Sequence, residues 1–178
     1  IMKRRSAWAS SRILYEEQTR FGRLRVVEEG NHRSLINDSL TQNVYDTGLR
    51  RGVSMFPHVL EGLARMHCAN LEKALCIGLG IGMTPRRLAA EGVVVEVADI
   101  NSAIPGIARN WFDFDPGIVH LHIADGREYV AHQPGRFDAV ILDAFHGGNA
   151  PLHLLTREAV GEWKRVLRKN GVLLVNCF

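Results

Sequence analysis

Three aspartates close apolar runs of this sequence, and a glycine-rich turn follows a fourth run. Asp99, Asp125 and Asp143 end "VVVEVAD", "VHLHIAD" and "FDAVILD", and "GLGIGM" completes "ALCIGLGIGM". The carboxyl ends of parallel strands meet at one edge of a sheet, where acids can accept hydrogen bonds from a nucleoside. A single aspartate is as often a helix cap or turn residue. All three acids beside the glycines favour a nucleoside-binding site.

The glycine turn has the spacing GxGxG. Gly78, Gly80 and Gly82 let the backbone turn sharply, and the helix after them presents its positive end. A dinucleotide-binding turn would have glycine where this chain has Met83, so that variant is disfavoured. Asp99 lies 17 residues beyond Gly82, where such folds place an acid that binds ribose hydroxyls. The spacing therefore predicts a nucleoside rather than a dinucleotide ligand.

These residues need strands that end at one edge, and the sequence predicts them. Apolar runs of strand length alternate with amphipathic segments, which is typical of a doubly wound α/β fold with a parallel sheet. The expected strands are 74–78, 93–99, 119–125, 137–143 and 172–178, and the expected helices are Pro85–Glu91, Ile104–Trp111, Arg127–His132 and Arg157–Leu167.

The first quarter of the chain has a different pattern. Residues 12–44 alternate in short runs around a turn at Gly30-Asn31, which predicts a hairpin or three-stranded meander. From Ser54 to His67 apolar residues fall at helical spacing. We therefore expect a small N-terminal β segment over 1–46 and a Rossmann-like domain over 47–178.

Composition excludes several classes of protein. The 178 residues are 46% hydrophobic, and the formal charge of +3 comes from dispersed arginines, which does not indicate nucleic-acid binding. No run approaches the roughly 18 apolar residues of a membrane span. Three cysteines suit buried thiols in a reducing compartment, so we expect a cytoplasmic protein. His120 and His122 alternate on one strand but have no third partner at metal-ligand spacing, so no metal is expected.

The motifs resemble a known family. "ALCIGLGIGM", "VEVADIN", "IADGREYV", "FDAVILDAF", "PLHLLTREA" and "LRKNGVLLVN" occur in the order found in spermidine synthase-like aminopropyltransferases, relatives of class I S-adenosylmethionine-dependent methyltransferases. The segment "RVVEEGNHRSLINDSLTQNVYD" is similar to that family's small β domain. The resemblance implies polyamine biosynthesis and a Rossmann-like methyltransferase fold.

The resemblance also implies roles for single residues. Asp99 would bind the ribose of decarboxylated S-adenosylmethionine or methylthioadenosine, and Asp125 would face the adenine amino group. The expected co-substrate is decarboxylated S-adenosylmethionine or S-adenosylmethionine. Asp143 would accept a proton from the attacking amine. The expected cofactor-binding residues are Gln42, Gly78, Gly80, Gly82, Asp99, Ile100, Asp125 and Gly126.

The chain departs from the family pattern at three places. Ile81 replaces the acid that holds the donor's terminal amine, and His146 replaces a second acid after Asp143. Phe56 and Pro57 match a Tyr-His pair that helps to hold polyamine. All three changes remove groups suited to cations. His146 is a second candidate catalytic residue, with a solvated loop residue as the alternative.

Three functional hypotheses follow. The first is an aminopropyltransferase acting on a small-molecule amine, the second a methyltransferase of the same fold, and the third a non-catalytic nucleoside-binding or assembly protein. Methyltransferase-like sheets continue with two strands beyond the one at 172–178, where this sequence stops. An apolar edge strand invites pairing with another chain, so either further sequence continues the sheet or oligomerisation covers this edge. A homo-oligomer, either dimer or tetramer, is expected.

Overall fold

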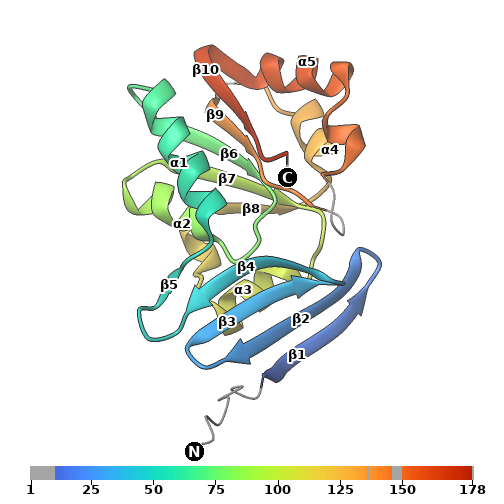
Figure 1. The fold of residues 1–178 in the computed structure, drawn as a ribbon. Helices are drawn as coiled ribbons and strands as arrows, with labels where there is room; N and C mark the ends of the chain where they lie inside the picture. Colours follow the sequence, from blue (N-terminus) through green and yellow to red (C-terminus); the bar gives the residue numbers. More distant parts are fainter. Residues whose placement is uncertain (1–10, 136, 146–149, 178) are drawn as a thin grey trace, which may run out of the picture.

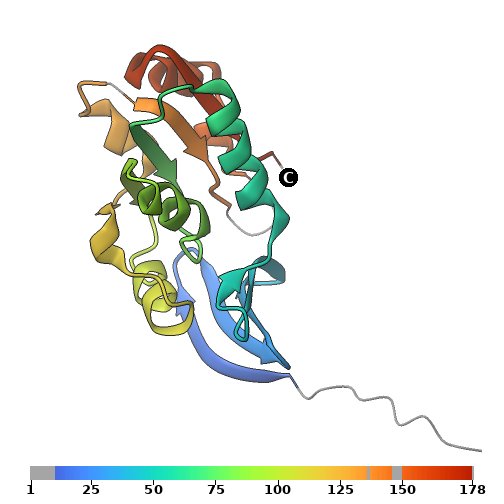
Figure 2. The same ribbon diagram turned by 90° about the vertical axis from the view of Figure 1, so that its left-hand side faces the viewer.

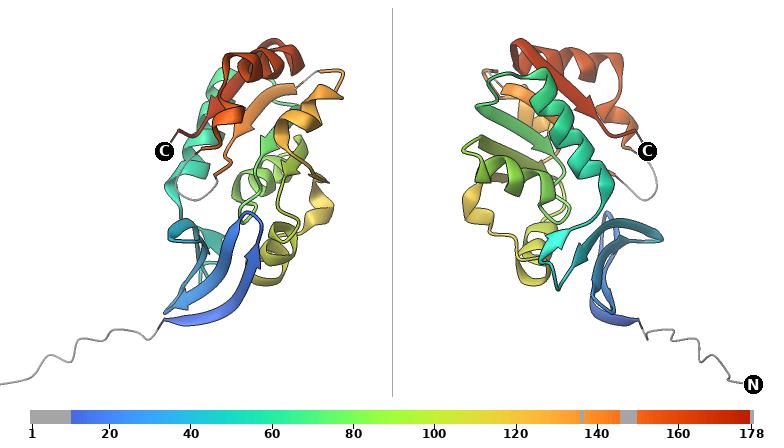
Figure 3. Two further views of the ribbon diagram at one scale, coloured as in Figure 1. Left: turned by 90° about the vertical axis from the view of Figure 1, so that its right-hand side faces the viewer. Right: turned by 60° about the vertical axis from the view of Figure 1, so that its left-hand side comes forward.

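The fold consists of two sheets, one antiparallel and one parallel, with helices on both faces of the second (Figure 1). The computed structural model describes residues 11–135, 137–145 and 150–177. The predicted α/β class with a small β segment in front of it is confirmed. Figures 2 and 3 show the antiparallel sheet as a separate layer below the parallel sheet.

The antiparallel sheet has more strands than the predicted hairpin or three-stranded meander. Its five strands pair in sequence order, and the predicted turn at residues 30–31 joins the second to the third. A short fifth strand extends the sheet to Gly52, past residue 46, where the sequence predicts the division between the two domains. That division stays a prediction. The strands are β1 Arg12–Thr19, β2 Gly22–Glu29, β3 His32–Asn37, β4 Leu40–Asp46 and β5 Arg51–Gly52.

The parallel sheet has the order β10-β9-β6-β7-β8. Its central strands are buried on both faces, and all six residues of β9 are buried, as expected when helices cover both sides. The strands are β6 Lys73–Ile77, β7 Val94–Asp99, β8 His120–Ile123, β9 Phe137–Leu142 and β10 Leu167–Val175. Strands β7 and β8 are added on one side of β6, and β9 and β10 are added on its other side. Ligands of open α/β sheets bind where the strand order changes direction in this way.

Helices cover the parallel sheet on both faces. Side chains of α1, α2 and α3 share one apolar core with the antiparallel sheet, and those of α4 and α5 form a second core on the opposite face. The helices are α1 Met55–His67, α2 Met83–Ala90, α3 Ile104–Trp111, α4 Gly126–Ala131 and α5 Arg157–Val166, with short 3-10 helices η1 Pro116–Ile118 and η2 Leu152–Leu154.

Helix α1 forms where predicted, but its buried face differs from the expected apolar stripe. Met55 and Met66 are 65% and 72% exposed, whereas Glu61 is 4% exposed. The Glu61 carboxylate forms ion pairs with Arg65 and with Arg87 of α2. These ion pairs determine which side of α1 faces α2. The contact between the two helices therefore contains a charged residue.

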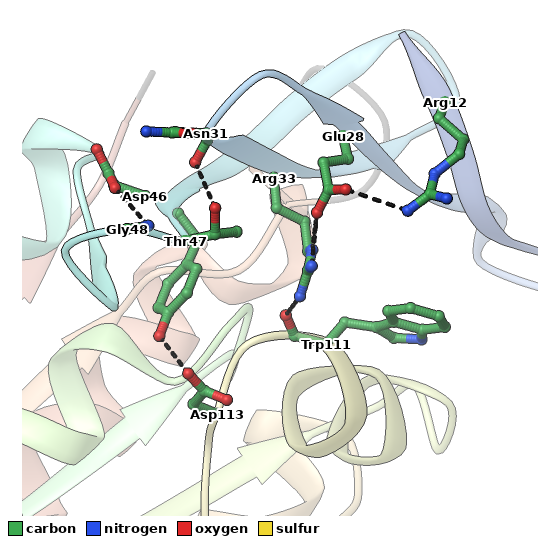
Figure 4. A network of polar contacts seen from close by, with 10 residues as sticks. Arg12, Glu28, Asn31, Arg33, Asp46, Thr47, Gly48, Trp111 and Asp113 are labelled. Atoms are coloured by element: carbon green, nitrogen blue, oxygen red, sulfur yellow. Dashed lines mark hydrogen bonds and ion pairs between the residues drawn. The ribbon is translucent and has the colours of Figure 1, made fainter.

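A polar network joins the antiparallel sheet to the loop after α3 (Figure 4). Arg33 of β3 donates to the Glu28 carboxylate at 3.0 Å and to the backbone carbonyl of Trp111 at 2.7 Å. Tyr45 of β4 donates its hydroxyl to Asp113 at 2.6 Å. The network holds the sheet against the domain that carries the strand ends.

Strand β10 has a single neighbour, β9, within the described part of the chain. It pairs with β9 at Leu167 and, after a register shift, from Val172 to Val175. The homo-oligomer expected from this edge stays a prediction. Among the described residues, no helix is long and apolar enough to cross a membrane.

Candidate functional site

A cavity of about 750 Å³ lies between the antiparallel sheet and the carboxyl ends of the parallel strands. All three predicted acids, Asp99, Asp125 and Asp143, contribute to its wall. Ile100 and Gly126, which follow two of these acids, line it as well. The strand ends thus bring together acids that are far apart in sequence.

The glycine turn follows β6 and needs glycine for two reasons. The φ angles of Gly78, Gly80 and Gly82 are +94°, +53° and +76°, in the left-handed region that disfavours side chains. A Cβ on Gly78 would lie 2.4 Å from the backbone oxygen of Asp143, and one on Gly82 would lie 2.3 Å from the Phe114 ring. The turn is therefore fixed by close contact as well as by backbone conformation.

Asp99 is 9% exposed and joins two neighbouring backbone segments. Its carboxylate accepts from the backbone N–H of Leu79 and of Asn101, both at 2.8 Å. Burial raises the pKa of Asp99, and these two hydrogen bonds partly oppose that rise. The carboxylate is thereby held at the glycine turn, in the position expected for a ribose-binding acid.

Asp125 has two roles at the start of α4. Its Oδ1 accepts from the backbone N–H of Arg127 and Glu128 at 2.9 and 3.2 Å, which caps the helix. Its Oδ2 lies 2.7 Å from Nε2 of His153. Burial opposes ionisation of Asp125, but the hydrogen bonds from His153 and the helix outweigh it and lower the pKa. Asp125 is therefore an anion with a defined orientation.

The antiparallel sheet contributes Gln42 and Asn43 from β4. Leu35 and Ile36 pair with Asn43 and Thr41, so Gln42 is the extra residue of a β-bulge. Bulges often redirect a side chain beside a functional site, and Gln42 lines the cavity. Asn43 is 8% exposed, and its Oδ1 accepts from the backbone N–H of Ile81 at 3.3 Å. Thus β4 supports the glycine turn directly.

Asp143 follows β9 and is held by a residue from the next strand. Asn176, just after β10, donates Nδ2–H to Oδ1 of Asp143 at 2.9 Å, and both residues line the cavity. Burial raises the pKa of Asp143, and the hydrogen bond from Asn176 lowers it by a smaller amount. A carboxylate with a raised pKa is a stronger base than an exposed one.

Two further sequence predictions concern histidines, one as a catalytic residue and the other as metal ligands. His146, the second catalytic candidate, lies outside the described residues. The His122 ring lies 4.6 Å from that of Tyr129, centroid to centroid. Within the described chain, no three His, Cys, Asp or Glu side chains are grouped as metal ligands.

Sequence reasoning missed Asn43 and Asn176. The sequence does contain a signal for Asn176, because this residue directly follows β10 just as Asp143 directly follows β9. Asn43 had none, since its contact with the glycine turn joins two regions 38 positions apart.

The sequence relatives found by comparison with known proteins include members of two enzyme classes. A polyamine aminopropyltransferase of Vibrio vulnificus is 35% identical over 135 residues, which cover 69% of this chain and 44% of that protein. An N-terminal histidine N-methyltransferase of Emericella nidulans is 33% identical over 110 residues, 59% of this chain and 20% of that protein. No family model matches the chain.

A solved structure shares the fold over most of the chain. The crystal structure of a spermidine synthase in complex with the transition state analogue AdoDATO superposes with a TM-score of 0.72, at 23% identity, over 92% of this chain and 57% of that one. The chain belongs to the spermidine synthase-like family of the class I methyltransferase fold. This spermidine synthase-like chain spans less than half the length of the Vibrio enzyme.

Proposed function

We propose that the protein transfers an aminopropyl group from decarboxylated S-adenosylmethionine to an amine. The observation that carries this proposal is the position of Asp143. This carboxylate has a raised pKa and lies in the same cavity as Asp99 and Asp125, whose carboxylates are held by hydrogen bonds. The Vibrio relative is a polyamine aminopropyltransferase, which supports the same reaction class.

The glycine turn and the first two acids would bind the donor. Asp99 would accept hydrogen bonds from the ribose hydroxyls, and Asp125 from the adenine amino group. Ile100, 39% exposed and part of the cavity wall, would contact the base. Gln42, placed by its bulge on the opposite wall, would contact the donor from the antiparallel sheet.

Asp143 would activate the acceptor. An amine is protonated at neutral pH and cannot attack until its nitrogen has a free lone pair. Asp143 would take the proton, and the nitrogen would then bond to the methylene carbon next to the donor's sulfonium. The carbon–sulfur bond breaks, its electron pair stays on sulfur, and methylthioadenosine leaves as a neutral thioether. Asn176 would keep the accepting carboxylate in place.

The test compares donors at saturating amine. Release of methylthioadenosine from decarboxylated S-adenosylmethionine, together with an aminopropylated product found by mass spectrometry, is the expected result. Absence of that product with every amine tried would reject the proposal. The predicted cytoplasmic location is part of the same proposal.

A methyltransferase is the second candidate, supported by the Emericella relative, an N-methyltransferase. Ile81 of the glycine turn is 1% exposed and apolar, at the position where the resembling aminopropyltransferases have an acid for the donor's amine. Calorimetry with both donors separates the candidates. Tighter binding of S-adenosylmethionine, with methyl transfer to an amine, would favour the methyltransferase.

A further inference from the structure

We propose that the acceptor is an amine with a single positive charge and an apolar body, rather than a diamine or polyamine. This inference rests on the proposed transfer to an amine and names its substrate class. It follows from the charges and the walls of the cavity.

One of the three cavity acids, Asp143, remains for an acceptor, because the donor would occupy Asp99 and Asp125, which also hold protein groups. Asp99 uses both oxygens to hold backbone N–H groups. Asp125 uses both oxygens on α4 and His153. Within the described part of the chain, the Asp143 carboxylate accepts from Asn176 at Oδ1, and Oδ2 would take an ammonium group. Within the described lining, these three are the carboxylates, so a second ammonium has no counter-charge of its own.

Part of the cavity wall is apolar. Leu24, Leu40, Phe56, Pro57 and Met83 line the cavity. The Thr84 hydroxyl donates to the Pro57 carbonyl at 3.4 Å, which places the start of α1 against α2 and the glycine turn. Such side chains stabilise an alkyl or aromatic body by burying its surface.

A cation at the cavity wall adds to this preference. Arg20, in the turn between β1 and β2, lines the cavity, and its guanidinium carbon lies 4.5 Å from the Phe21 ring centroid. A second ammonium would meet this like charge or the apolar wall, and removing an unpaired ammonium from water is unfavourable. A monoamine avoids both contacts and still presents one ammonium to Asp143.

The experiment uses two amines that differ at one end only, n-hexylamine and 1,6-diaminohexane. Calorimetry on protein saturated with methylthioadenosine should show n-hexylamine binding at least about tenfold more tightly. Equal or tighter binding of the diamine, or binding of neither amine, would overturn the inference. Because calorimetry measures binding without turnover, the result can be interpreted even if the transfer reaction fails. If methylthioadenosine itself does not bind, the proposed function fails, and the same pair is titrated into the free protein.

A variant that adds a carboxylate makes the test independent of the wild-type affinities. Phe56 is the second residue of α1, where an acid is compatible with the positive helix end. Phe56→Asp should shift the preference toward the diamine by about tenfold, because a second counter-charge becomes available. Phe56→Asn has nearly the same shape without the charge and should not shift it. An equal shift in both variants, or none in Phe56→Asp, would contradict the inference.

Discussion

The two halves of the cavity are built in different ways. In the donor half, around Asp99, Asp125 and the glycine turn, the carboxylate oxygens hold backbone or side-chain donors, and the turn touches its neighbours closely. In the acceptor half, Asp143 has one hydrogen bond from Asn176 and apolar walls nearby. The donor acids are therefore held mainly through the backbone, whereas the Asp143 carboxylate is held by a side chain. Two of the three departures from the family pattern, at Phe56-Pro57 and at His146, concern the acceptor, whereas the third, Ile81, lies in the donor half.

The largest expected effect concerns the backbone of the donor half. Gly78→Ala should lower the free energy of unfolding by about 2–4 kcal/mol, because a side chain at positive φ is strained and its Cβ meets the Asp143 carbonyl. Gly92 has a similar φ of +86° but open space around it. Gly92→Ala is therefore the control for strain alone, at about 1–2 kcal/mol. Equal losses in urea unfolding would show that close contact does not fix the turn.

The next effect tests the donor half as a binding site. Asp99→Asn removes the charge at nearly constant shape, so methylthioadenosine should bind about 10–100-fold more weakly. Calorimetry measures the affinity, and a thermal melt confirms that the variant is folded. An unchanged affinity in a folded variant would remove Asp99 from the site.

These contrasts also explain what the sequence could predict. The strand ends and the glycine turn follow local rules, because apolar runs, turn residues and their spacing lie within a few positions of one another. β1 was missed as a separate strand, since "RILYEEQT" buries little of its surface and gives a weak alternation. The orientation of α1 depends on the pairing of Glu61 with Arg87, a contact with another helix. Asn43 acts on the glycine turn from another sheet.

A smaller effect is expected at His153. His153→Ala removes the hydrogen bond to Oδ2 of Asp125 and should weaken methylthioadenosine binding about fivefold. His153→Gln keeps a donor and should restore most of the affinity. If both variants bind like the wild type, the orientation of Asp125 does not depend on His153.

The smallest effect sharpens the acceptor half. If Asp143 is the base, kcat/KM should fall as the pH drops through the raised pKa of Asp143, because the protonated acid cannot accept another proton. Asn176→Ala removes a hydrogen bond that lowers this pKa, so the acidic limb should move to higher pH. Asn176→Gln, with the same amide group, is the matched rescue. If the acidic limb of the pH profile stays in place in Asn176→Ala, then Asn176 has a structural role only.

The most direct test of the division between the two halves is Asp143→Asn, studied by calorimetry and single-turnover kinetics on the same preparation. The account predicts that methylthioadenosine binds with unchanged affinity while amine transfer falls by at least about 100-fold, in line with loss of a general base. Unchanged transfer, or a loss of nucleoside binding as large as the loss of transfer, would contradict it.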